Sequence, residues 1–256
     1  MRPAGLGRVP NPLTFGLLVA LAGVACATKT SSKPKSDARA PTRTVDTATA
    51  GFISGAVRLN GTPPAGQSFP IAEPACKNPG GRTISDVLVS DGKLQNAFVY
   101  IRDGLEDYKF DAPDGEVEID QTGCSYAPLV VGVRVGQPLV FVNNDRTLHN
   151  VHTLPEENDG TNFAMPMLGQ RSSLKFGASE VMIKTKCDVH PWMRAWVGVV
   201  AHPHFAVTGP DGAFAFQGVP PGDYVIEAWH ERFGRVSQSV HLGEKGRETL
   251  DLAMTP

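Results

Sequence analysis

Two short segments of this sequence hold side chains that together could bind a soft metal ion. Cys187, His190 and Met193 stand in Lys-Cys-Asp-Val-His-Pro-Trp-Met-Arg, and His149 stands upstream in Leu-His-Asn-Val-His. The set comprises a thiolate, two imidazoles and a thioether. One Cys and two His in a plane, with a weak Met ligand on the axis, form the donor set of electron-transfer copper sites. We therefore predict these four residues as ligands of one copper ion.

The spacing of these residues explains how a single ion could receive all four side chains. Cys187 is predicted to end one strand and Met193 to begin the next, so the residues between them form a tight loop. His149 would come from the end of a different strand, where a rigid sheet rather than a flexible loop positions it. Zinc also accepts one Cys and two His. Met is a poor zinc ligand, so we favour copper.

At these two motifs the sequence resembles the cupredoxins, in particular the amicyanin- and plastocyanin-like blue copper proteins, over residues 125–202. The resemblance implies a Greek-key β-sandwich that carries single electrons on one type 1 copper ion. It also implies that His149, Cys187 and His190 are the equatorial ligands and that Met193 is the axial ligand.

The resemblance further implies roles for residues beside the ligands. Asn150 matches the neighbour that braces the ligand loop in this family. Its usual partner is a hydroxyl residue directly after the Cys, and here that position holds Asp188. In the family the His of the ligand loop is the port for electrons, which implies that role for His190. Trp192 would be either an exposed aromatic at a docking surface or part of the core.

The other His and Met residues could in principle bind a metal ion, but we expect them to be surface, linker or packing residues. On a regular strand His152 points away from His149, because side chains alternate, so we expect it on the surface or beside the site. For the rest we expect linker residues that form at most a weak metal pair (His202 and His204), solvated side chains (His230 and His241) and packing against the sandwich (Met165 and Met167).

Three of the four cysteines have expected roles other than that of Cys187. In an exported protein, cysteines outside a metal site are usually paired. We expect a structural disulfide between Cys76 and Cys124, which would close a loop of about 49 residues and stabilise the protein by roughly 4 kcal/mol. A second metal or redox site at these two cysteines is the weaker alternative. Cys26 is expected to carry a lipid.

The N-terminus is interpreted as a signal for export. Residues 1–26 hold two Arg, no acidic residue and an apolar run of about 13 residues, which is typical of a signal peptide. The run ends in Gly-Val-Ala-Cys, close to a bacterial lipoprotein cleavage site, and cleavage after Ala27 is the alternative. Residues 27–50 are polar, without periodicity, and are predicted to form a disordered tether. We therefore expect a periplasmic or surface protein, anchored to the membrane only through Cys26.

From residue 51 onward the pattern predicts an all-β protein. Short strand-like runs alternate with turn signals such as Asn-Gly and Asp-Gly, which is typical of a sandwich or barrel. Residues 154–171 are expected to form a long loop. The predicted strands are 53–59, 87–89, 97–102, 116–120, 130–135, 139–143, 150–153, 173–176, 181–186, 196–201, 206–208, 213–216, 224–229, 237–242 and 248–253.

A second resemblance covers the C-terminal part. Residues 208–229 hold an Asp-Gly hairpin and a Pro-Pro-Gly-Asp-Tyr turn, and resemble the carboxypeptidase regulatory-like domains, which are transthyretin-like sandwiches without catalytic residues. We divide the chain into a copper domain with an N-terminal β extension at 51–202 and the small β-domain at 203–256. Residues 53–64 resemble the first strand of the same family. A split C-terminal domain, completed by strands from 51–102, is therefore the alternative.

Composition narrows the function. The sequence has 24 basic and 26 acidic residues and no basic stripe, which argues against a nucleic-acid partner. The sequence shows no nucleophilic triad, phosphate loop or second metal cluster that would indicate an enzyme. We expect a carrier of single electrons in the bacterial envelope, with a redox protein as its partner. The alternatives are copper capture or delivery, and an envelope binding or structural module without redox activity.

Overall fold

The computed structural model describes residues 41–71, 73–76, 82–85, 87–111 and 113–256. These residues form twenty strands and one short 3-10 helix, so the all-β prediction is confirmed. The predicted signal peptide, Cys26 and the first part of the tether lie outside the described residues. No helix in the described part of the chain has the length and hydrophobicity that crossing a membrane requires.

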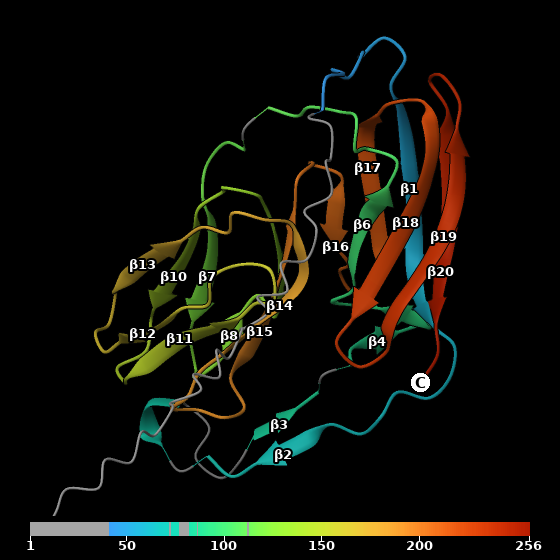
Figure 1. The fold of residues 1–256 in the computed structure, drawn as a ribbon. Coiled ribbons are helices and arrows are strands. Elements are labelled where there is room, and N and C mark those ends of the chain that lie inside the picture. Colours follow the sequence, from blue (N-terminus) through green and yellow to red (C-terminus); the bar gives the residue numbers. More distant parts are fainter. Residues whose placement is uncertain (1–40, 72, 77–81, 86, 112) are drawn as a thin grey trace, which may run out of the picture. The chain divides into compact units, whose positions relative to one another are not determined.

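The first sandwich consists of two sheets made by strands β7 to β15 (Figure 1). One sheet has the order β13-β10-β7-β8, and the other has the order β12-β11-β14-β15-β9. Their inward-facing side chains form one buried apolar cluster, which includes Phe141 and Val197. The strands are Val117–Gln121 (β7), Tyr126–Ala127 (β8), Val130–Arg134 (β9), Leu139–Asn143 (β10), His149–Leu154 (β11), Asn162–Met165 (β12), Arg171–Leu174 (β13), Glu180–Lys186 (β14) and Arg194–Val200 (β15).

The second sandwich has a sheet of order β17-β1-β5-β4, in which β20 also pairs with β1, and a sheet of order β16-β6-β18-β19. Alternating side chains of β20, among them Leu250 and Leu252, are buried in its core, as expected for a strand with one solvated face. The strands are Gly51–Leu59 (β1), Val89–Ser90 (β4), Lys93–Leu94 (β5), Phe98–Asp103 (β6), Phe205–Val207 (β16), Ala213–Val219 (β17), Gly222–His230 (β18), Gly234–Leu242 (β19) and Arg247–Met254 (β20).

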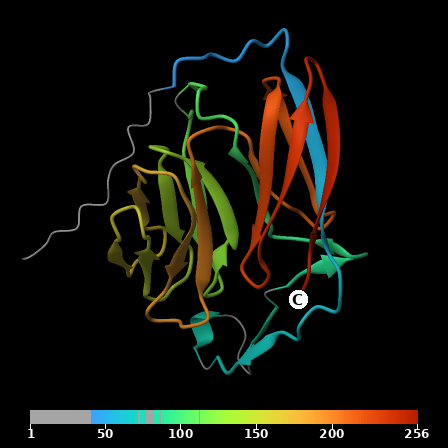
Figure 2. The ribbon, with the colours of Figure 1, turned by 45° about the vertical axis from the view of Figure 1, so that its right-hand side comes forward.

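The division of the chain at residue 203 does not follow the strand pairing. Strand β1 pairs antiparallel with β17 and parallel with β20, and β6 pairs with β16 and β18. Figure 2 shows β1, in blue, between the C-terminal strands in orange and red. Strands β1, β4, β5 and β6 therefore complete the C-terminal sandwich, as in the alternative of a split domain, and the first sandwich is inserted between β6 and β16. The reason is physical: the C-terminal strands need partners for their backbone groups and cover for their apolar faces.

Two further expectations need correction. The segment 154–171 is not only loop, because it contains β12, which pairs antiparallel with β11. Residues 41–50, which we assigned to the tether, are bonded to the folded part: the Arg43 N–H donates to Asp107 O over 2.9 Å, and the Lys245 N–H donates to Thr49 O over 2.8 Å. These backbone hydrogen bonds help to offset the entropy of ordering the segment, which its polar composition alone does not offset.

A separate segment lies between β1 and β4. It holds the two-stranded sheet of Gln67–Phe69 (β2) and Arg82–Ile84 (β3), and the 3-10 helix Pro74–Cys76 (η1). We call the described residues 67–71 and 73–76 the cap segment. Its buried residues Ile71 and Cys76 pack with Cys124 of the first sandwich. The cap segment therefore reaches the end of the first sandwich at which the predicted ligands stand.

Candidate metal centre

The backbone places the predicted ligands at strand ends, as the spacing requires. His149 is the first residue of β11, Cys187 directly follows β14, and Met193 directly precedes β15. The Cys187 N–H donates to Met193 O over 3.0 Å, and the Met193 N–H donates to His190 O over 2.9 Å. The loop is thus closed on itself by two backbone hydrogen bonds, and its width is set before any ion binds.

Three of the four predicted ligands present their donor atoms to one point. His149 Nδ1 lies 3.1 Å from His190 Nδ1, and Cys187 Sγ lies 3.8 Å from the same His190 Nδ1. The three residues form a buried metal-competent cluster. Met193 is buried in the apolar cluster that also holds Cys187. The exposed fraction of the four residues is between 0% and 2%, so the donors are closed to solvent.

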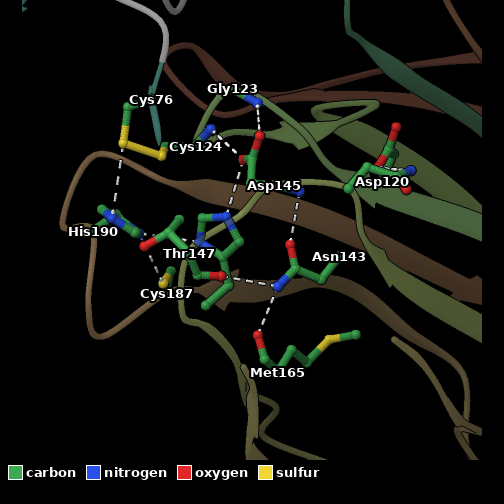
Figure 3. A network of polar contacts seen from close by, with 12 residues as sticks. Cys76, Asp120, Gly123, Cys124, Asn143, Asp145, Thr147, Met165, Cys187 and His190 are labelled. Carbon is green, nitrogen blue, oxygen red and sulfur yellow. Dashed lines mark hydrogen bonds and ion pairs between the residues drawn. A yellow bond between two sulfur atoms is a disulfide. The ribbon is translucent and has the colours of Figure 1, made fainter. Parts of the chain in front are cut away.

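Both histidines turn their other ring nitrogen to a carboxylate. His149 Nε2 lies 3.0 Å from Asp145 Oδ2, and His190 Nε2 lies 2.8 Å from Glu73 Oε2 (Figure 3 labels Asp145 and His190). An ionised carboxylate only accepts, so each Nε2 is the N–H donor. Both Nδ1 atoms then face each other as acceptors beside the thiol sulfur. A cation between them relieves this repulsion, and carboxylates that orient metal-binding histidines in this way are common.

The surroundings of Cys187 favour the thiolate form of its side chain. Burial by itself raises the pKa of the thiol, but the neighbouring imidazoles of His149 and His190, together with backbone groups, outweigh burial and lower the pKa to about 6. The thiolate is the form that ligates metal ions. Burial also opposes protonation of His190, yet Cys187 and Glu73 leave the pKa of this imidazole raised above its usual value. A proton therefore competes with a metal ion for this site.

The expected brace of the ligand loop forms, with Asp188 in place of a hydroxyl residue. The Asp188 N–H donates to Asn150 Oδ1 over 2.6 Å, and Asn150 Nδ2 donates to Asp188 Oδ2 over 3.1 Å. Asp188 also contacts Lys186 and His152, each with an ion-pair distance below 3 Å. These contacts, with Lys186 the largest contributor, hold the pKa of the Asp188 carboxyl far below its usual range. His152 is thus beside the site, as expected, and is not a ligand.

The structure does not present His190 at the surface. Its exposed fraction is 2%, because Glu73 and the disulfide of the cap segment cover the Nε2 edge; Cys76 Sγ lies 3.9 Å from Nε2. Trp192 is half-buried, its ring centroid lies 5.3 Å from that of His190, and its Nε1 donates to Cys124 O. Trp192 therefore belongs to the cover over His190 and is partly exposed on its outer side.

The disulfide prediction is confirmed, because Cys76 and Cys124 are joined in the structure. Met165 is fully buried and packs in the core as expected, whereas Met167 is exposed. Because Cys76 and Cys124 are bonded to each other, they do not form a second metal site. The candidate metal site is therefore the cluster of His149, Cys187 and His190.

Three of the outlying histidines are buried: His202 and His204 lie between β15 and β16, as expected of linker residues, whereas His230 was expected to be solvated. His202 Nε2 donates to Ile101 O over 2.8 Å, and its Nδ1 accepts the His204 N–H. With both nitrogens engaged, His202 cannot share an ion with His204. His230 is buried against the ring of Phe233. His202 and His204 pack against the ring of Phe110, a contact between distant segments that strand patterns cannot show. His241 is exposed as expected.

Sequence reasoning missed the two carboxylates. Asp145 stands four residues before His149, and the requirement that a ligating His has a partner for its other nitrogen could have indicated it. Its carboxylate is buried and also accepts the N–H groups of Gly123 and Cys124, both over 2.8 Å. Glu73 is far away along the chain. Only its place three residues before Cys76 connected it with this region.

Comparison with known proteins gives similarity to solved copper proteins over part of the chain. No family model matches, and no curated protein matches. The copper-containing nitrite reductase of Thermus scotoductus SA-01 is 22% identical over 34% of this chain and 23% of its own, with a TM-score of 0.30. A Cu(I) form of an amicyanin variant is 26% identical over 35% of this chain and 86% of its own, also with a TM-score of 0.30. A purple cupredoxin from Nitrosopumilus maritimus is 25% identical over 33% of this chain and 99% of its own, with a TM-score of 0.28. The functional assignment therefore rests on the site itself.

Proposed function

We propose that this protein is a type 1 copper protein that carries single electrons and has no enzymatic activity of its own. The observation that carries the proposal is the convergence of His149 Nδ1, His190 Nδ1 and Cys187 Sγ in a buried cluster, with Met193 in the same core. Bound copper would supply one-electron exchange between its two oxidation states. The chain supplies a soft donor set and a loop of fixed width, which keeps the rearrangement on electron transfer small.

The closed site favours an electron carrier over copper delivery. Delivery needs ligands that a partner protein can reach, whereas these four residues are almost fully buried. Electrons can cross a thin protein cover that an ion cannot. Because His190 is covered, we propose that the exchange with a redox partner passes through Trp192, whose ring lies against that of His190.

We further propose that the protein is exported and held at the membrane by a lipid on Cys26. The apolar N-terminal run and its Gly-Val-Ala-Cys end support this. The second sandwich would be a transthyretin-like spacer or binding module of the carboxypeptidase regulatory-like type. Mass spectrometry of the mature N-terminus tests the anchor: a lipidated Cys26 supports it, and a chain that begins after Ala27 contradicts it.

The test of the metal site is an optical and electron paramagnetic resonance spectrum of the purified protein with one equivalent of Cu(II). An intense visible thiolate-to-copper absorption with narrow copper hyperfine splitting is expected. Cys187→Ala should abolish the colour. A pale, ordinary Cu(II) spectrum would indicate copper capture or delivery instead. A colourless protein that binds zinc or no metal would indicate a structural or binding module.

A further inference from the structure

The carboxylates of the two ligating histidines come from different parts of the chain. Asp145 stands in the loop before β11, within the first sandwich, and serves His149. Glu73 stands in the cap segment, directly before η1, and serves His190. Neither belongs to the ligand loop. The orientation of each imidazole therefore depends on a residue that the loop itself does not control.

A single disulfide links the two chain segments that hold these carboxylates in place. Cys76 ends η1, and its N–H donates to Glu73 O over 3.1 Å, so the two residues belong to one turn. Cys124, its partner in the disulfide, donates its N–H to Asp145 Oδ2 over 2.8 Å. Figure 3 shows the disulfide beside His190 and the Cys124 and Gly123 amides aimed at Asp145. One short path thus runs from His190 to His149 through both carboxylates.

The cap segment meets the metal site through the disulfide, through Glu73 and through apolar side chains, among them Phe69, whose ring centroid lies 6.3 Å from that of Trp192. Strands β2 and β3 pair only with each other among the described residues. The carboxylate of Glu73 contacts Thr147 and His190, and the apolar contacts of the segment gather around the disulfide. Without the covalent bond, these noncovalent contacts alone would have to offset the entropy of ordering the segment. The disulfide lowers that cost, because it restricts the segment in the unfolded chain as well.

We propose that Glu73, Asp145 and the Cys76–Cys124 disulfide form one positioning unit, which holds both imidazoles with Nδ1 turned to the metal and seals the outer edge of His190. This inference rests on the proposed copper site. It assigns the disulfide a role in metal binding in addition to fold stability. Partners of this kind around metal ligands typically change metal affinity about 10- to 100-fold.

The test compares Cu(II) affinities, measured by competition with a chelator of known affinity, for the whole protein and its variants. Glu73→Ala keeps the disulfide and should lower the affinity about 10- to 100-fold. Glu73→Gln keeps an acceptor oxygen for His190 and should lower it less. Glu157→Ala removes an exposed carboxylate of the first sandwich and is the matched control, for which the Cu(II) affinity should be unchanged.

The disulfide is tested with the double variant Cys76→Ala and Cys124→Ala, which leaves no new thiol beside His190. Its copper affinity should fall at least as far as that of Glu73→Ala. If the folded double variant binds copper like the wild type, the disulfide has no part in positioning. If the double variant does not fold, Glu73→Ala decides, because it retains the covalent bond.

A second readout uses the metal-free protein and separates the two proposals. Nitrogen NMR of the imidazole rings should find His190 with its proton on Nε2 in the wild type, and a mixture of tautomers in Glu73→Ala. A wild type without copper affinity would overturn the proposed function but leave this readout valid. A wild type that binds copper, beside a Glu73→Ala variant with the same affinity and tautomer, would overturn the positioning unit.

Discussion

Phe98 of the C-terminal sandwich lies directly on Gly198 of the first sandwich. A Cβ atom at position 198 would stand 2.5 Å from Cζ of the Phe98 ring, and one at Gly132 would stand 2.8 Å from Cε2 of the same ring. Gly132 and Gly198 are paired across β9 and β15. The two glycines thus form a flat seat for the aromatic ring, and the two sandwiches share a buried cluster around it.

This seat makes Gly198→Ala a sensitive probe of the contact between the sandwiches. The added methyl group must displace the ring or the strand, and such overpacking costs about 1–3 kcal/mol. Urea denaturation of the metal-free protein should show this loss. Gly177→Ala, where an added Cβ meets no atom within 4 Å, is the control and should be close to neutral. Equal midpoints for the two variants would mean that Phe98 does not fill the seat.

Met193→Leu should retain copper and raise its reduction potential. The thioether is a weak axial donor that favours the oxidised ion, and leucine has a similar volume but no donor atom. Potentiometric titration of the loaded protein measures the change. If copper is lost altogether, Met193 is required for binding rather than for tuning. A potential equal to that of the wild type would show that its sulfur does not contact the ion.

Removal of the buried carboxylate of Glu227 should destabilise the second sandwich. Its side chain is 6% exposed and accepts hydrogen bonds from Tyr100 over 2.7 Å, Arg102 over 3.1 Å and Arg235 over 2.5 Å. Glu227→Ala leaves these donors without their acceptor. Because both arginines are partly exposed, water recovers part of the loss, and we expect about 1–3 kcal/mol of destabilisation.

The control for this variant is Glu118→Ala, which breaks an ion pair between side chains that are nearly half exposed. Surface pairs of that kind contribute about 0–1 kcal/mol. Chemical denaturation of both variants at one pH gives the comparison. Equal losses would mean that the group around Glu227 is solvated in solution rather than enclosed.

Stability should fall at mildly acidic pH because of His202 and His204. Burial lowers the pKa of each imidazole from 6.5 to about 4, so the folded protein keeps both neutral where the unfolded chain takes up protons. Their contribution is complete above pH 6.5 and decreases as the pH falls toward 4. The slope is about 1.4 kcal/mol per pH unit for each histidine.

His204→Phe tests this linkage, because the ring fills similar space and cannot titrate. The free energy of unfolding of the metal-free variant should depend less on pH between 4.5 and 6, a window set by these pKa values. His241→Phe replaces an exposed histidine and is the control. A pH dependence in His204→Phe that matches the wild type would show that His204 is protonated in the folded state.

Much of the first sandwich and the ligand set could be predicted, because those features are local. Alternating side chains mark strands, and the spacing from Cys187 to Met193 defines a loop whether or not the rest of the fold is known. The same holds for His149, which opens a recognisable strand. The disulfide followed from counting, since only Cys76 and Cys124 lacked another role.

What the sequence by itself determined was therefore the strand content, the four candidate ligands and the cysteine pair. The tertiary structure alone decided that β1 and β6 complete the C-terminal sandwich, and that Glu73 covers His190. The physical reason is that strand pairing and ion pairs between distant segments depend on which surfaces meet after folding. No periodicity along the chain records this, so the buried edge of His190 and its carboxylate partner could be found only in three dimensions.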